Sequence, residues 1–95
     1  MKIKIFKKNL AKTAKKIYKD LKSENFNCSE TYEVGRDAFK WLRWQSGTWK
    51  LEKELEELYH TSTNKYAYVT VCAESDDYGD KVIYVELKII NNKNI

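Results

Sequence analysis

The sequence contains no proline, only three glycines, two cysteines and one histidine. No linker, repeat or low-complexity segment interrupts it. Cys28 and Cys72 lie far apart and outside a Cys-x-x-Cys spacing, which argues against a disulfide framework or a zinc site and predicts two free thiols. His60 has no cysteine or serine partner at a spacing typical of catalysis, so we expect no triad, no metal site and no cofactor.

Long hydrophobic runs are also missing. No stretch approaches the roughly 20 apolar residues that cross a bilayer, and Met1–Phe6 alternates lysine with isoleucine where a signal peptide would be apolar. We therefore expect a cytoplasmic protein without a membrane partner. The 95 residues are too few for two hydrophobic cores, so we predict one domain over residues 1–95, with Asn91–Ile95 as a frayed tail.

Hydrophobic periodicity predicts mixed α and β structure that closes on a C-terminal β-hairpin. The helices are expected at 10–22, 36–45 and 49–60 and the strands at 2–6, 67–73 and 82–90, with a brief extended segment at 31–34. Asn9 and Thr48 are expected to cap the helices that follow them, and Gly47 to end the second helix. Because a hairpin alone is only marginally stable, the N-terminal strand should complete a three-stranded sheet packed on the helices, an α+β fold.

Charge is distributed unevenly along the chain, whose formal net charge is +4. The first 22 residues hold nine lysines and one carboxylate, Asp20, and six of the lysines fall opposite the apolar stripe of the first predicted helix. We call this set the lysine face; it consists of Lys8, Lys12, Lys15, Lys16, Lys19 and Lys22. Like charges three and four residues apart repel, which costs this helix on the order of 1 to 2 kcal/mol where salt screens little. An anionic partner would remove that repulsion.

Two other interpretations of the lysine face stay open at this point. Either it is a solvated surface that keeps copies of the chain apart, or the third predicted helix neutralises it with Glu52, Glu54, Glu56 and Glu57. As a binding surface it suits phosphate backbones, acidic protein surfaces or anionic membranes. The membrane is the least favoured of these, because the apolar stripe of the helix is needed for the core.

Aromatic residues supply a second candidate surface. The second predicted helix and the start of the third interleave basic residues with Phe39, Trp41, Trp44 and Trp49. These rings cannot all face one core. Either the second helix lies between two layers, or Trp44 is partly exposed as an anchor of the kind that dominates protein interfaces.

Three tyrosines of the predicted hairpin form a third candidate surface. Tyr66, Tyr68 and Tyr84 share the face of the sheet opposite the apolar one. Tyrosines there either stabilise the sheet by pairing across strands or form a platform on which single-stranded bases stack.

One pattern points to catalysis. Glu86 and Lys88, preceded by Asp76, Asp77 and Asp80, resemble the Asp plus Glu-x-Lys signature of restriction-endonuclease-like nucleases. The resemblance implies carboxylates that hold Mg²⁺ and a lysine that stabilises the attacking water. Glu-x-Lys is also the expected outer face of an amphipathic strand, and too few residues follow it to complete that family's core. We therefore favour a protein that is not an enzyme and holds no metal.

The sequence thus favours a small protein that binds or inhibits a larger protein or nucleoprotein complex stoichiometrically, through the lysine face together with Trp44 or the tyrosines. In build, a short α+β chain rich in lysine and asparagine and free of proline resembles the small inhibitors of phages and mobile elements, including anti-CRISPR proteins. The first alternative is a largely non-specific nucleic-acid-binding protein that uses Lys8–Lys22. The second, less favoured, is a Mg²⁺-dependent nuclease. The oligomeric state stays open.

Overall fold

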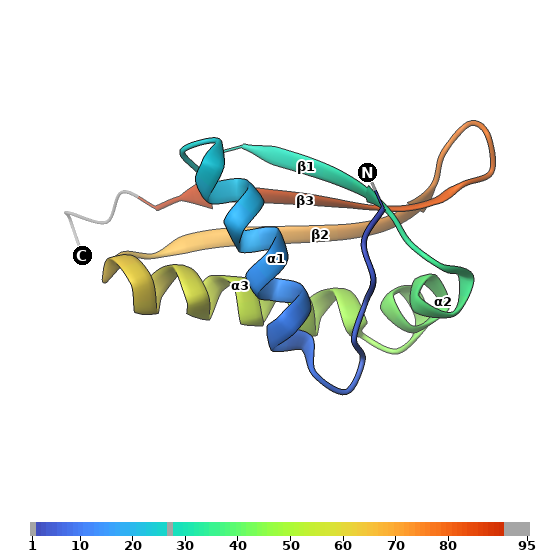
Figure 1. The fold of residues 1–95 in the computed structure, drawn as a ribbon, viewed down its shortest axis with the longest axis horizontal. Helices are drawn as coiled ribbons and strands as arrows, with labels where there is room; N and C mark the ends of the chain where they lie inside the picture. The colour runs from blue at the N-terminus through green and yellow to red at the C-terminus, as the bar shows by residue number, and fades with distance from the viewer. Residues whose placement is uncertain (1, 27, 91–95) are drawn as a thin grey trace.

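The structure is a computed structural model that describes residues 2–26 and 28–90, with three helices and three strands (Figure 1). Along the chain these are α1 (Leu10–Ser23), β1 (Ser29–Glu33), α2 (Arg36–Trp44), α3 (Gly47–Thr63), β2 (Ala67–Ser75) and β3 (Lys81–Ile89). The predicted α+β class is confirmed. None of the helices in the described part of the chain is long and apolar enough to cross a membrane. The predicted tail at 91–95 lies outside the described residues.

The strands form an antiparallel sheet in the order β1–β3–β2, so β3 lies in the centre and β2 at one edge. Alternate side chains point to opposite faces, and those on the inner face are buried. They are Tyr32 of β1, Ala67, Val69 and Val71 of β2, and Ile83, Val85 and Leu87 of β3. α1 crosses the sheet and α3 runs along β2 (Figure 1). The helices leave the other face open, as the exposed side chains of Tyr68 and Tyr84 show.

The predicted N-terminal strand at 2–6 is wrong. In this segment only Lys2 forms a bridge, an isolated parallel one to Glu33, and the Ile3 N–H donates to the Glu33 carbonyl at 3.0 Å. The first regular element of the chain is therefore a helix. The third strand of the sheet is β1, at the place where the sequence indicated only a brief extended segment.

A side chain of α1 takes the place of a strand partner for this segment. The Phe6 N–H donates to Thr13 Oγ1 at 3.0 Å, and the Thr13 hydroxyl donates to the Lys4 carbonyl at 3.4 Å. Ile3 is buried and Ile5 half-buried. The alternation of the sequence thus reflects burial of every second side chain, without the pairing that would make a strand.

The corner between α2 and α3 also differs from the prediction. Gly47 begins α3, and the residue before it, Ser46, has a left-handed backbone with φ of 60°. A Cβ at position 47 would lie 2.6 Å from Trp41 Cε3 and 2.8 Å from Leu42 Cα. Glycine is therefore needed here because the start of α3 approaches α2 too closely for a side chain. Thr48 lies inside α3 and does not cap it. Asn9 precedes α1 as predicted, but its side chain forms no cap hydrogen bond.

All six elements contribute apolar residues to the core, and one buried polar contact ties α1 to β1. Tyr32 is fully buried, and its hydroxyl donates to Asp20 Oδ2 at 2.7 Å. Burial, reinforced by this hydrogen bond to a carboxylate, raises the pKa of Tyr32 far above its usual range. Asp20 is the only carboxylate of α1, and this bond directs it toward the core.

Candidate functional site

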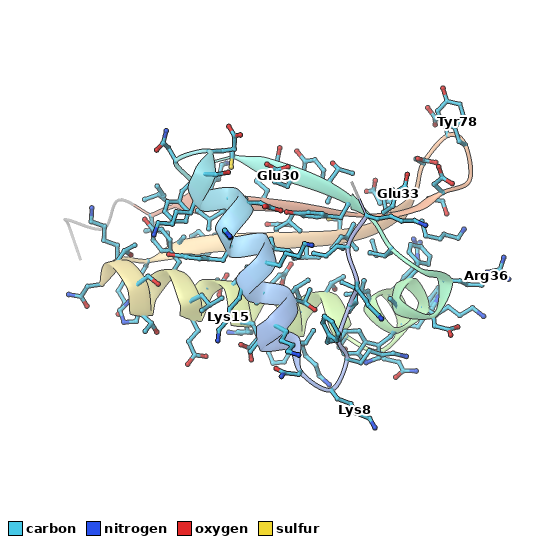
Figure 2. The ribbon with its side chains drawn as sticks, viewed as in Figure 1. Lys8, Lys15, Glu30, Glu33, Arg36 and Tyr78 are labelled. Atoms are coloured by element: carbon cyan, nitrogen blue, oxygen red, sulfur yellow. The ribbon has the colours of Figure 1, made fainter. Side chains whose placement is uncertain are left out.

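The lysine face lies on the outer side of α1. Five of its lysines belong to the helix, whereas Lys8 lies in the turn before it. All six are exposed, while Ala14, Ile17 and Leu21 on the opposite side are fully buried. Figure 2 shows Lys8 directed away from the body of the protein, with Lys15 further along α1. The amphipathic division of this helix is therefore the one that the sequence predicts.

Carboxylates of α1 and of the neighbouring α3 are bonded to groups other than the lysines. Asp20 accepts the Tyr32 hydroxyl. α3 packs against α1, but Glu52 and Glu56 bind the backbone of β2 (below) instead of the lysines. Over residues 2–26 and 28–90, no ion pair joins a lysine of the face to a carboxylate. Neutralisation by α3, one of the two interpretations left open, is thus not found.

Glu52 and Glu56 close the edge of the sheet. β2 is an edge strand, and its outward N–H groups would otherwise lack protein acceptors. Glu52 Oε2 accepts from the Val71 N–H at 2.8 Å, and Glu56 Oε2 from the Val69 N–H at 3.0 Å. Four helix residues rise about 6.0 Å and two strand residues about 6.7 Å, so carboxylates four apart on α3 match amides two apart on β2. The sequence shows the four-residue spacing of these glutamates but not their target.

The aromatic residues of the α2–α3 corner are divided between core and surface. Phe39 is buried and Trp41 half-buried, whereas Trp44 is 73% exposed. The Arg43 guanidinium lies 5.4 Å from the centre of the Trp44 ring and steadies it. Trp49, at the start of α3, is also exposed. Trp44 is therefore available to a partner, in the way that an interface anchor requires.

The tyrosines do not form one platform. Tyr66 stacks on the imidazole of His60 in α3, with ring centres 4.4 Å apart, and so turns away from the open face. Tyr68 lies opposite Lys88, and Tyr84 lies opposite Cys72. Lys88, which lies opposite Tyr68, is four positions along β3 from Tyr84, so the two tyrosines are about 13 Å apart along the strand direction.

Glu86 lies between the two remaining tyrosines and changes what this face can bind. Its register position is opposite Thr70, in the row between those of Tyr68 and Tyr84. A carboxylate there repels phosphate, and rings this far apart cannot stack on neighbouring bases. The face is thus poorly suited to single-stranded nucleic acid.

The nuclease-like residues are kept apart by the hairpin. Asp76 Oδ1 accepts from the N–H groups of Tyr78 and Asp80 at 3.0 and 2.9 Å, which is a turn-forming role. Glu86 follows Asp80 by six residues, about 20 Å along an extended strand. The described residues contain no group of three or more His, Cys, Asp or Glu that could hold a metal ion.

The β2–β3 turn contains an exposed aromatic residue that the sequence did not single out. Tyr78 is 91% exposed at the tip of the β2–β3 hairpin (Figure 2). Gly79 beside it has a φ of 84°, which favours glycine and tightens the turn. Its position in the middle of an otherwise polar turn is the sequence feature that could have indicated an exposed aromatic residue.

Both cysteines are free, as predicted. Burial, followed by the charges of Glu30 and Glu24, raises the pKa of the Cys28 thiol. Cys28 is therefore protonated at neutral pH and a weak nucleophile. Cys72 is exposed on the open face of the sheet.

No protein family model matches this chain, and no curated protein or solved structure shows significant similarity to it. The exposed surfaces described above are therefore the basis on which its function is inferred.

Proposed function

We propose that this protein is a cytoplasmic, non-enzymatic binding protein that attaches stoichiometrically to a larger protein or nucleoprotein complex through the lysine face. The support for this proposal is one observation: six exposed lysines share a surface on which no carboxylate is paired with them within the described residues. Such a protein would act as an inhibitor, in the way of the small inhibitors of phages and mobile elements, including anti-CRISPR proteins, that it resembles in build.

The energetics of α1 support a binding role for this face. A solvent-exposed helix usually mixes charges of both signs, because like charges at these spacings cost about 0.2 to 0.5 kcal/mol per pair. Here the one carboxylate of the helix is directed toward Tyr32. An acidic surface would replace the repulsion with attraction and would also accelerate encounter with the partner. Trp44, which is exposed on α2, would add an apolar anchor to the contact.

Direct nucleic-acid binding is the second candidate. It is favoured by the row of lysines along α1, since lysines contact phosphates without reading sequence. It lacks support from the sheet, where Glu86 and the spacing of Tyr68 and Tyr84 disfavour base stacking. This candidate predicts binding to random DNA or RNA at low salt that weakens steeply as salt is added.

One pair of variants tests the use of the lysine face. Lys15→Glu with Lys19→Glu reverses the centre of the face, and Lys40→Glu with Lys50→Glu makes the same change of net charge on exposed lysines elsewhere. We expect the wild type and the Lys40→Glu/Lys50→Glu variant to capture a partner from cell extract in stoichiometric amount. The Lys15→Glu/Lys19→Glu variant should not capture it. Equal recovery by all three proteins would exclude this face as the contact. Recovery of nucleic acid alone, with matching binding to random oligonucleotides, would favour the second candidate.

A further inference from the structure

A groove of about 620 Å³ lies beside the N-terminal segment, within the range of ligand sites. One side is formed by residues 2–7 and the other by the junction of β1 with α2, from Glu33 to Ala38. Lys16 of the lysine face also lines it. The groove is therefore continuous with the surface that we propose binds the partner.

The backbone of Ile5 is free on the side of this groove. Thr13 bonds the Lys4 carbonyl and the Phe6 N–H, and both of these groups therefore point toward α1. Ile3, two residues before Ile5, donates its N–H to the Glu33 carbonyl on the other side of the segment. Alternate residues of an extended chain direct their backbone groups to the same side, so the Ile5 N–H and carbonyl are expected to face the groove as well. Ile5 forms no hydrogen bond with any other described residue. One strand-like pair of backbone groups is thus left open to the groove.

The side chains of the groove define the chemistry of what fits it. Its lysines outnumber its carboxylates: they are Lys2, Lys4, Lys7 and Lys16, against Glu33 and Asp37. Apolar side chains lie between them, from Ile5, Val34 and Ala38 among others. A ligand that alternates carboxylates with aliphatic side chains matches this pattern. Nucleic acid would satisfy the lysines but offers no aliphatic groups for the rest.

We infer that this groove receives an extended acidic segment of a partner protein, which adds to the Ile5 backbone as a short strand and pairs its carboxylates with the groove lysines. The inference rests on the proposed function and deepens it, because it specifies that the partner is a protein and not a nucleic acid. It also gives a role to the strand-like sequence of residues 2–6, which pairs with no strand of the sheet beyond the bridge at Lys2.

The test uses a capped peptide, Glu-Val-Glu-Val-Glu, titrated into the ¹⁵N-labelled protein and followed by NMR. We expect the amide resonances of Ile5, Val34 and Ala38 to shift, and amide exchange at Ile5 to slow at least about tenfold at saturation, because pairing protects its N–H. Lys4→Glu with Lys7→Glu should weaken binding at least about tenfold. Lys15→Glu with Lys19→Glu, which lies outside the groove, should leave it unchanged.

Three results would overturn the inference. In the first, the peptide does not bind, or it shifts only the amide resonances of residues outside the groove. In the second, the peptide binds but amide exchange at Ile5 stays unchanged. In the third, an oligothymidylate of equal charge shifts the amide resonances of the groove residues when the peptide does not. A control peptide, Lys-Val-Lys-Val-Lys, should not bind. Since the peptide assay uses this chain alone, its failure is separate from that of the lysine face, which the capture experiment tests with lysines outside the groove.

Discussion

Replacing Glu52 and Glu56 together by alanine should destabilise the protein and unmask the edge of β2. In the native protein their carboxylates accept the N–H groups of Val71 and Val69, which point away from β3. The double variant leaves both amides without a protein acceptor, at an edge that can then pair with another chain. The perturbation therefore has two readouts, stability and association.

The size of the effect follows from the two bonds. A hydrogen bond to a charged group contributes about 1.5 to 3 kcal/mol, and these two are only partly buried, so the lower end applies to each. Alanine recovers a few tenths of a kcal/mol per site through its higher helix propensity. We expect a net loss of about 2 to 3 kcal/mol, which lowers the midpoint of urea unfolding by about 1 to 2 M.

Urea unfolding followed by tryptophan fluorescence measures the first readout, and light scattering after size-exclusion chromatography measures the second. Glu54→Ala with Glu57→Ala is the matched control, since it removes the same charge from the same helix without removing a hydrogen bond to β2. The control should change stability by less than about 0.5 kcal/mol and leave the molar mass unchanged. If both double variants lost stability equally, or if the first kept the native midpoint and mass, the edge-closing role would be refuted.

Three further predictions concern the stability of the fold. Gly47→Ala should cost about 1 to 3 kcal/mol in urea unfolding because of the clash with α2, whereas Gly35→Ala, where an added Cβ meets nothing within 4 Å, should cost little. Tyr32→Phe should cost about 1.5 to 3 kcal/mol at neutral pH, because the lost hydrogen bond is made to a charged carboxylate. The folded pKa of Tyr32 lies above its unfolded value of about 10, so this contribution is complete below about pH 10 and declines as the pH rises above it. Unfolding midpoints between pH 8 and about 11 should therefore fall more steeply in the wild type than in Tyr32→Phe. Lys15→Glu with Lys19→Glu should raise stability by about 1 kcal/mol at low salt, an increase that high salt removes; a loss of stability would contradict the repulsion argument.

The helices and the hairpin were predictable because their signals are local. The apolar stripe of α1 and the alternation in β2 and β3 each predict an element within a few residues of its observed bounds. The segment at 2–6 shows a case in which a local pattern predicts the wrong element. Its alternation is as regular as that of the hairpin, yet Thr13 of α1 satisfies its backbone and β1 takes its place in the sheet. A period-two pattern predicts which side chains are buried, but it does not identify what the backbone pairs with.

The candidate sites also differ in whether local spacing or long-range packing determines them. The lysine face depends on one helix, so its residues follow from spacing alone. The roles of Glu52 and Glu56 depend on a strand more than ten residues further along the chain, and the stacking of Tyr66 depends on where α3 ends. Gly47 shows the same limit. Only glycine fits at this position, because Trp41 in the preceding helix leaves no room for a Cβ atom. Long-range packing decides these features, and no local pattern encodes it.

A salt-dependent titration of the captured partner into the wild type and the two lysine variants tests the central claim most directly. If the lysine face is the contact, the wild type and Lys40→Glu/Lys50→Glu should bind with equal affinity and a stoichiometry of one. Lys15→Glu/Lys19→Glu should bind at least about a hundredfold more weakly, and raising the salt should narrow that difference. Equal affinities of all three proteins at low salt would contradict the account.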